Sequence, residues 1–382
     1  MPSNYSSIQD LTAMAYNGTP DYDHANPARV GLLLTNLGTP EAATPKALRK
    51  YLAEFLWDPR VVEIPRPIWW LILNLIILNV RPKRSAETYA KIWTPAGSPL
   101  MQHTLDQTAA VKQYLADIDL TEIEVACAMR YGQPSIESTL HALQKKNVTR
   151  LLVMPLYPQY SAATTASTFD AVAQTLSKMR WMPELRFINQ YCDQPLFIKA
   201  CAKQISDYWK EKKRSEKLLF SFHGVPKRYL LQGDPYHCQC HKTARLIAKE
   251  LGLSSEEYLT TFQSRFGREE WLKPYTDETL EQLGKDKLGS IDIFCPGFSS
   301  DCVETLEEMD MLNREVFTDA GGGDFQYIPA LNSTPHHVQA IAEIARQHMQ
   351  GWPQVTAEYD WQAHHKERDE TRRLALEMGS KN

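Results

Sequence analysis

The sequence lacks several features that would place it in a common class of protein. It contains no uncharged apolar run of 18 residues, so we expect no membrane-spanning helix. Its formal net charge of −4 offers no overall basic field for nucleic acid. Neither a P-loop motif nor a G-x-G-x-x-G fingerprint follows the first expected strand, so nucleotide binding has no support. The polar segment 1–27 has no signal-peptide pattern, and we expect a loose N-terminal arm there.

Cysteine is sparse and irregularly placed. The chain has seven cysteines, an odd number without the spacing of a disulfide framework. This pattern favours a reducing compartment, so we expect the chain to be cytoplasmic. Two cysteines lie in His237-Cys238-Gln239-Cys240-His241, which lacks the second ligand pair of a zinc site. We expect a loop there that leads into a helix at Lys242, with a bound metal or cluster as the alternative.

The chain does contain many short apolar runs that alternate with amphipathic stretches. Turn-forming residues bound the runs, which is typical of buried strands. Strands that alternate with helices favour parallel βαβ units and an α/β fold. The expected strands cover residues 30–34, 123–129, 151–154, 185–188, 218–222, 258–262, 291–295 and 325–328.

The two halves of the chain repeat one four-strand plan. We therefore predict two similar α/β domains, each with a four-stranded parallel sheet, and a cleft between them. The first domain is expected over residues 28–182 and the second over 183–350, followed by a polar C-terminal tail over 351–382.

An insertion at about residues 50–99 separates the first two strands of the first half. It carries an apolar run over 68–80 that is too short to span a bilayer, which takes about 20 residues. One interpretation is a core helix. The other is an apolar lip that admits a large hydrophobic ligand or dips into a membrane surface. Basic residues flank this run: Arg66, Arg81, Lys83 and Arg84.

The residues that could carry chemistry lie in the second half. His223 follows the run 218–222 and precedes a Gly-Val-Pro turn, and parallel sheets place ligand sites at such strand ends. Asp301, Glu304 and Glu308 have the spacing of one helix face. Acids near a helix start are also favoured by the helix dipole alone. A carboxylate stripe suits a hard divalent cation or a proton relay, and a facing histidine suits a metal ligand or a general base.

Six motifs of the sequence resemble the ferrochelatase family, of the bacterial type. Members of this family insert ferrous iron into protoporphyrin IX. The motifs stand in the family's order, and the resemblance runs from about residue 30 to 348. They are LLTNLGTP (33–40), MPLYPQYS (154–161), SFHGVP (221–226), GDPY (233–236), FQSRFG (262–267) and PGFSSDCVETL (296–306).

The resemblance implies two Rossmann-like, chelatase-like domains with the porphyrin in the cleft. It places the family's invariant histidine at His223 and its metal-proximal glutamate at Glu304, as catalytic and metal-binding residues. The family's outer acidic residues match Asp301 and Glu308. Its porphyrin-binding positions match Leu37, Arg81, Tyr89, Ser98, Arg130, Tyr131, Tyr236 and Trp271.

Two departures from the family pattern concern cysteine. Some members have a histidine where this chain has Cys302, which leaves the role of that position open. Other members bind an iron–sulfur cluster through C-terminal cysteines, but no cysteine follows Cys302 here. We therefore expect no such cluster and no permanently bound cofactor.

The implied activity makes protoporphyrin IX and Fe²⁺ the substrates and protoheme the product, as in the last step of haem biosynthesis. The alternatives are a chelatase for another tetrapyrrole, either a coproporphyrin ferrochelatase or a cobaltochelatase, and a non-catalytic haem-binding or haem-delivery protein. The acidic stripe favours catalysis, and Trp69-Trp70 favours the least polar porphyrin. The apolar run 68–80 adds, as an alternative location, a peripheral position at the inner face of the cell membrane. The sequence leaves open the oligomeric state, the side of iron entry and the choice between base and ligand for His223.

Overall fold

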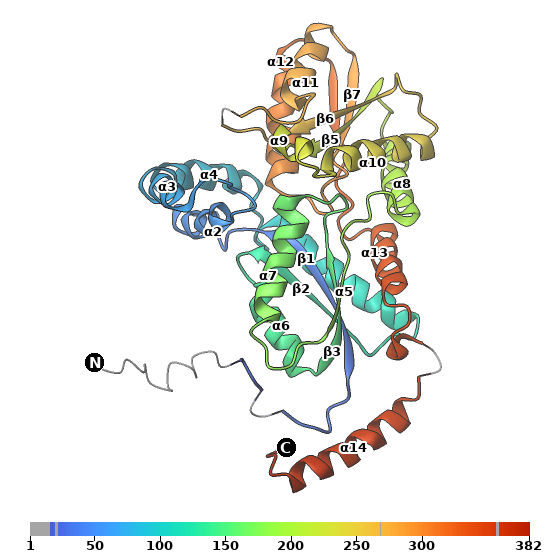
Figure 1. The fold of residues 1–382 in the computed structure, drawn as a ribbon. Coiled ribbons are helices and arrows are strands. Elements are labelled where there is room, and N and C mark those ends of the chain that lie inside the picture. Colours follow the sequence, from blue (N-terminus) through green and yellow to red (C-terminus); the bar gives the residue numbers. More distant parts are fainter. Residues whose placement is uncertain (1–15, 20–21, 268, 357–358) are drawn as a thin grey trace, which may run out of the picture.

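The computed structural model describes residues 16–19, 22–267, 269–356 and 359–382. Most of the predicted N-terminal arm, residues 1–15, lies outside the described residues. Figure 1 shows two α/β units stacked end to end, with helix α14 (Trp361–Glu377) beyond the first unit. No helix within the described ranges combines the length and apolar character needed to cross a membrane.

The first unit contains a four-stranded parallel sheet in the order β2-β1-β3-β4. Leu32, Leu33 and Leu34 in the interior of β1 are fully buried, because helices cover both faces of the sheet. The strands are β1 (Arg29–Gly38), β2 (Ile123–Tyr131), β3 (Val148–Pro155) and β4 (Glu184–Phe187).

The second unit repeats this plan with the parallel order β6-β5-β7-β8. Each expected strand is therefore present, and the prediction of two four-stranded parallel sheets is confirmed. The strands are β5 (Lys217–His223), β6 (Tyr258–Gln263), β7 (Ser290–Phe294) and β8 (Asp324–Tyr327).

Helices connect the strands of both sheets. In the first half they are α2 (Pro45–Trp57), α3 (Arg66–Ile72), the π-helix η2 (Leu73–Ile77), α4 (Leu78–Ile92), α5 (Pro99–Asp117), α6 (Ile136–Lys145), the π-helix η3 (Ala162–Ala166) and α7 (Ser167–Leu176). In the second half they are α8 (Pro195–Glu211), α9 (Lys227–Leu231), α10 (Tyr236–Glu250), α11 (Thr276–Lys285), the π-helix η4 (Glu304–Asn313), α12 (Arg314–Asp319), α13 (Pro335–His348) and the short 3₁₀-helix η5 (Pro353–Val355).

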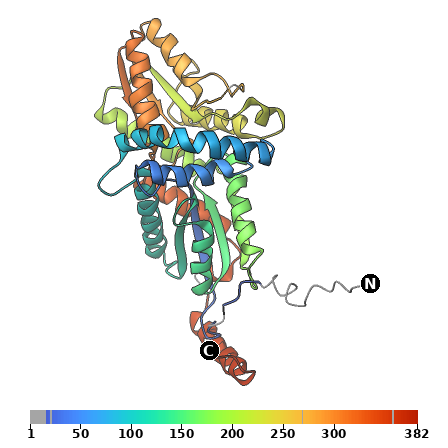
Figure 2. The same cartoon turned by 90° about the vertical axis from the view of Figure 1, so that its left-hand side faces the viewer.

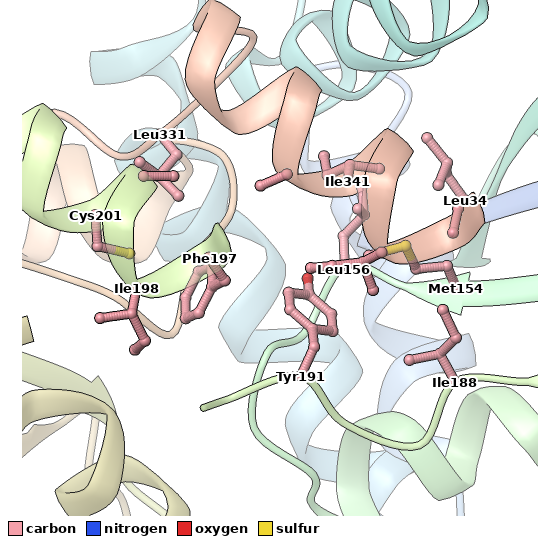
Figure 3. Packing of buried hydrophobic residues seen from close by; sticks show 14 of the residues in the cluster. Leu34, Met154, Leu156, Ile188, Tyr191, Phe197, Ile198, Cys201, Leu331 and Ile341 are labelled. Carbon is pink, nitrogen blue, oxygen red and sulfur yellow. The ribbon is translucent and has the colours of Figure 1, made fainter. Parts of the chain in front are cut away.

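The two units are not separated at the predicted boundary between residues 182 and 183. Strand β4 follows that boundary but pairs with β3 in the first sheet. Helix α13, near the other end of the chain, packs against both α5 and α8. One hydrophobic cluster therefore runs through both units, and Figure 3 shows Ile341 of α13 beside Leu34 and Met154 of the first sheet.

The insertion after β1 has one buried and one exposed apolar face, so its run is in part the core helix of the first interpretation, and the lip remains a prediction. Helices α3, η2 and α4 follow one another without a break and lie across the junction of the two sheets (Figure 2). One face, with Trp69, Leu73 and Leu78, is buried against α2. The opposite face is exposed and carries Ile68, Trp70, Leu71, Leu75, Ile76 and Val80.

Two local predictions are corrected. The stretch 237–241 is not a loop, because α10 begins at Tyr236 and its first two turns contain the stretch. The polar tail does not begin at residue 351, because Trp352 is buried and its Nε1 donates a hydrogen bond to Glu184 Oε1 (2.6 Å). Only α14 fits the description of a tail, and it has no buried residue.

One buried side chain ties the two units together next to their shared cleft. Gln107 on α5 donates from Nε2 to the backbone carbonyls of Ser299 (2.9 Å) and Asn332 (3.0 Å), both in the second unit. Because Gln107 is fully buried, water cannot replace these hydrogen bonds.

We therefore expect Gln107→Leu to lower the free energy of unfolding by about 1–3 kcal/mol, since it leaves two buried carbonyls without a donor. Urea denaturation followed by circular dichroism measures this change. Gln113→Leu, at an exposed position of the same helix, is the matched control. Equal stability of the two variants would show that the bridge contributes nothing.

Candidate active site

A cavity lies where the central strands of both sheets end. In each sheet the order in which strands are added reverses between the two central strands, β1 and β3 or β5 and β7, and open α/β sheets bind ligands at such switch points. The space between the walls of the cavity is about 820 Å³, a figure that includes volume open to solvent. Its walls include Asn36, Leu37, Gly38, Thr39, Tyr51, Tyr89, Ser98, Leu156, Tyr157, Gln159, Tyr236, Phe298, Ser299, Ser300 and Cys302, with His223 and Glu304.

His223 ends β5 and is half-buried in the wall of this cavity. Its Nδ1 lies 2.6 Å from the carbonyl oxygen of Gly224. Because a carbonyl oxygen only accepts, Nδ1 carries the proton, and Nε2 of the neutral ring keeps a free lone pair. The backbone of Gly224 must also approach closely, since a Cβ there would stand 2.8 Å from the carbonyl oxygen of Gln263.

The predicted acidic helix is the π-helix η4, which begins at Glu304. In a π-helix the turn is wider than in an α-helix, so Glu304 and Glu308 lie close to one turn apart on the same side. Glu304 lines the cavity, whereas Glu308 lies behind it. Gln263 connects the two residues, because its Nε2 donates to the backbone carbonyl of Glu304 (2.8 Å) and to Glu308 Oε2 (3.2 Å).

Glu308 is a half-buried carboxyl group with several donors. The backbone N–H of Ser264 donates to its Oε1 (2.7 Å), and the hydroxyl of Ser264 donates to its Oε2. Burial raises the pKa of Glu308 above its ordinary value of 4.5, while the hydrogen bonds from Ser264 and Gln263 oppose the rise. Glu308 is therefore suited to hold a proton near the cavity.

Asp301 does not face the cavity. Its Oδ1 accepts hydrogen bonds from the Tyr327 hydroxyl (2.6 Å), Thr305 Oγ1 (3.0 Å) and the Ala330 N–H (3.3 Å). Its Oδ2 accepts one from Asn332 Nδ2 (2.8 Å). A carboxylate with four donors holds the loop before η4 in place, so the geometry gives no support to the prediction of a metal ligand at this position.

Comparison with known proteins identifies the family. A family model described as Ferrochelatase matches residues 29–349. A ferrochelatase of Marinobacter nauticus is 56% identical over 90% of this chain and 94% of its own length. One of Thioalkalivibrio sulfidiphilus is 54% identical over 96% of this chain and its full length. The chain belongs to the ferrochelatase family. Among solved structures, SirB from Bacillus subtilis with Fe³⁺ matches with a TM-score of 0.47 and 14% identity, over 87% of this chain and 99% of that chain.

The ferrochelatase resemblance predicted eight porphyrin-binding residues, and four of them line the cavity. These are Leu37, Tyr89, Ser98 and Tyr236, which come from four different elements or their flanks. Burial, and then the nearby charge of Glu304, raises the pKa of Tyr89, so its hydroxyl stays protonated and can donate a hydrogen bond. The hydroxyl of Ser98 is 2.8 Å from Thr39 Oγ1.

Two of the other predicted residues, Arg130 and Tyr131, do not line the cavity. Both side chains bind the buried carboxylate of Asp58, at 2.5 Å from Arg130 Nη2 and 2.8 Å from the Tyr131 hydroxyl. The Asp58 carboxylate also accepts from Ser167 Oγ (2.6 Å). These partners tie β2 to α7 and to the end of α2, so the predicted porphyrin contacts of Arg130 and Tyr131 have no support in this geometry.

Arg81 and Trp271 lie outside the walls of the cavity but join a chain of side chains that ends at His223. The Arg81 guanidinium is 5.8 Å from the ring centre of Phe266. The ring centres of Phe266 and Trp271 are 4.9 Å apart, and those of Trp271 and His223 are 6.4 Å apart. Arg81 and Trp271 are therefore neighbours of the catalytic candidate rather than parts of the cavity wall.

Several residues of the cavity wall were not predicted as site residues. Tyr157, Ser299 and Ser300 have buried hydroxyls without a hydrogen-bond partner among the described residues, and all three border the cavity. They lie in two of the ferrochelatase-like motifs, 154–161 and 296–306, directly after expected strands. Parallel sheets bind ligands at the carboxyl ends of their strands, so this rule could have predicted them. Tyr51 is in the middle of α2, where its spacing is that of an ordinary core residue.

The raised pKa of Glu308 predicts a pH dependence of stability. Above pH 4.5 the unfolded chain loses a proton that the folded chain keeps, so stability falls as the pH rises toward the folded pKa. Glu308→Gln lacks this contribution. We therefore expect the free energy of unfolding of the unsubstituted chain, relative to the variant, to decrease from pH 4 to pH 8 in urea titrations.

Glu315→Gln removes an exposed carboxylate from the neighbouring helix α12 and serves as the control. A constant difference between the unsubstituted chain and Glu308→Gln across this pH range would contradict a raised pKa at Glu308.

Proposed function

We propose that this chain inserts Fe²⁺ into protoporphyrin IX to give protoheme and two protons. The observation that carries the proposal is the pairing of His223 and Glu304 in the wall of one largely apolar cavity. A neutral imidazole and a carboxylate are the two kinds of group that this reaction needs, because it removes protons from nitrogen and brings in a hydrated cation.

The proton balance assigns a task to each side chain. Insertion of iron removes one proton from each of two pyrrole N–H groups. The free lone pair of His223 Nε2 can accept the first proton or bind iron, and the geometry suits either role. Glu304 can accept the other proton or bind the ion as it loses water. Both tasks use side chains of the chain, with Fe²⁺ as a substrate, so we propose that no permanently bound cofactor takes part.

Glu308 gives a released proton a place to go. Its carboxyl group shares the donor Gln263 Nε2 with the backbone carbonyl of Glu304, which places it one turn from that residue, and burial raises its pKa. A group of this kind accepts a proton that leaves the cavity and returns it to solvent later. The proposed order is therefore from the porphyrin to His223 or Glu304, and then to Glu308.

The walls of the cavity suit a flat aromatic macrocycle. Tyr51, Tyr89, Tyr157 and Tyr236 present ring faces or edges to it, and Leu37 adds apolar contact. Arg81 is exposed beyond the aromatic chain and can pair with a propionate group of a bound porphyrin.

Two alternative functions differ from this proposal in testable ways. Coproporphyrin carries more carboxylates than protoporphyrin, and the exposed apolar face of the insertion favours the less polar substrate. A haem carrier would need an axial ligand but no carboxylates behind it, whereas Glu304 and Glu308 are both present. Comparing iron insertion into protoporphyrin and coproporphyrin, and cobalt insertion into sirohydrochlorin, separates these functions.

We expect His223→Ala to abolish iron insertion while protoporphyrin still binds, because the variant loses Nε2 but keeps the other walls. Anaerobic mixing with protoporphyrin and Fe²⁺, followed by absorption, measures insertion, and fluorescence titration measures binding. His336→Ala, at a half-buried position outside the cavity, is the matched control. Substantial turnover by His223→Ala would exclude both proposed roles of the imidazole.

We also propose that the exposed apolar face of α3, η2 and α4 contacts a lipid surface. Six large apolar side chains lie on it, from Ile68 to Val80. Arg81, Lys83 and Arg84 follow directly and are exposed, which suits anionic head groups. Tyr89, further along α4, lines the cavity, so this surface leads toward the proposed porphyrin site.

Co-sedimentation with vesicles that contain phosphatidylglycerol tests this contact. We expect the doubly substituted variant Trp70→Ser, Ile76→Ser to lose most of the binding, because it removes two exposed apolar side chains. The control is Leu374→Ser, Leu376→Ser, which removes two exposed apolar side chains from α14. Equal loss in both variants, or no binding by the unsubstituted chain, would contradict the proposal.

A further inference from the structure

Two histidines outside the cavity wall lie one turn apart on helix α10. His237 and His241 have the i, i+4 spacing that places both side chains on one face of an α-helix. Their ring centres are 4.5 Å apart, with an angle of 56° between the ring planes. Neither residue lines the cavity, and the proposed reaction uses neither of them.

Both rings lie over Phe262, a buried residue of the edge strand β6. The ring centre of Phe262 is 5.7 Å from that of His237 and 5.8 Å from that of His241. The histidines are half-buried, and none of their ring nitrogens has a hydrogen-bond partner among the described residues. The ring of Phe262 thus packs against both imidazoles and keeps them side by side, while their nitrogens remain without hydrogen-bond partners among the described residues.

The protonation state of the pair suits metal binding. Burial lowers the pKa of His237 and of His241 below the ordinary value of 6.5. At His241, the neighbouring His237 and Arg245 lower the pKa further. Both rings are therefore neutral at neutral pH. A neutral imidazole has the lone pair that a transition-metal ion requires.

We propose that His237 and His241 form a chelating site for a divalent transition-metal ion such as Zn²⁺, Co²⁺ or Cu²⁺. Two histidines at this helical spacing bind zinc in the H-x-x-x-H arrangement of metalloenzyme helices. The described residues contain no group of three or more metal-ligating side chains, so the remaining coordination positions are open to water or another ligand.

The charges around the two histidines do not attract a cation, and this limits which metal ions can bind. The start of α10 and Arg245, one turn after His241, both disfavour a cation. Asp234 partly offsets them, because its Oδ1 accepts the N–H of Tyr236 (2.9 Å) at the start of the helix. Binding therefore depends on coordinate bonds to nitrogen, which favour Zn²⁺ or Cu²⁺ and exclude Mg²⁺.

A bound ion would also act on the cavity. Tyr236 precedes His237 and lines the cavity from the first turn of α10. An ion shared by residues 237 and 241 cross-links the first two turns of this helix. Occupancy of the pair therefore restrains the turn that positions Tyr236.

Calorimetric titration of the porphyrin-free chain with ZnCl₂ tests the site. We expect His241→Gln and His237→Gln each to weaken one Zn²⁺-binding event by about tenfold or more, since each removes one of two ligands. His365→Gln, which removes an exposed histidine of α14, should leave the titration unchanged. Iron insertion without added zinc should also be unchanged in His241→Gln. All three variants keep His223 and Glu304, so any ion bound there is present in every titration. Loss of zinc binding at His237 and His241 can therefore be distinguished from a failure of the proposed iron insertion.

A second measurement uses the unsubstituted chain, so it does not depend on the folding of a variant. The electron paramagnetic resonance spectrum of one equivalent of Cu²⁺ bound to the unsubstituted chain should show coupling to two imidazole nitrogens, and an excess of Mg²⁺ should not displace the ion. Arg245→Ala should tighten Zn²⁺ binding. Identical Zn²⁺ titrations of the unsubstituted chain and His241→Gln, or a Cu²⁺ spectrum without two-nitrogen coupling, would overturn the proposal.

Discussion

The hydrogen bond from His223 Nδ1 to the carbonyl oxygen of Gly224 is the constraint on which the site depends. It fixes the ring tautomer, so the free lone pair is on Nε2, the nitrogen that has no hydrogen bond to the backbone. The bond requires a sharp turn directly after β5, and Gly224 permits that turn because it has no Cβ to meet Gln263. The Gln263 side chain, in turn, donates to the backbone carbonyl of Glu304 and to the carboxylate of Glu308, so one residue holds the start of η4 beside the end of β5.

The repeated fold provides two similar walls with different chemistry. The ends of β1 and β5 occupy equivalent places in their sheets. The first presents Asn36, whose amide is bound to Thr104 and to the backbone of Leu37, and the second presents His223. The first unit therefore supplies shape and apolar contact, while the second unit supplies the groups that exchange protons. This division makes the cavity asymmetric although the sheets are alike.

The strands could be predicted because buried parallel strands leave a period and an abrupt turn in the sequence, as at residues 218–226. The setting of Asp301 could not, because its partners Tyr327 and Asn332 come from a strand and a loop that only the fold brings near. The same holds for Arg130, whose partner Asp58 follows α2. The wider turn of η4 was also invisible, since the spacing of Glu304 and Glu308 fits an α-helix as well as a π-helix. The family resemblance supplied the roles of His223 and Glu304, which spacing alone left open.

The position of α13 has a consequence for how the chain is made. This helix covers the first sheet next to Leu34 and Met154, yet it is synthesised after the whole second sheet. At ordinary rates of translation, roughly 10–40 s pass between the emergence of β3 and that of α13. During this interval the first sheet lacks part of its cover, so apolar side chains of β1 and β3 stay accessible on the ribosome. The first half of the chain therefore depends on a helix near the end of the chain to finish folding, and a truncated product that ends before α13 would be a substrate for chaperones or proteases.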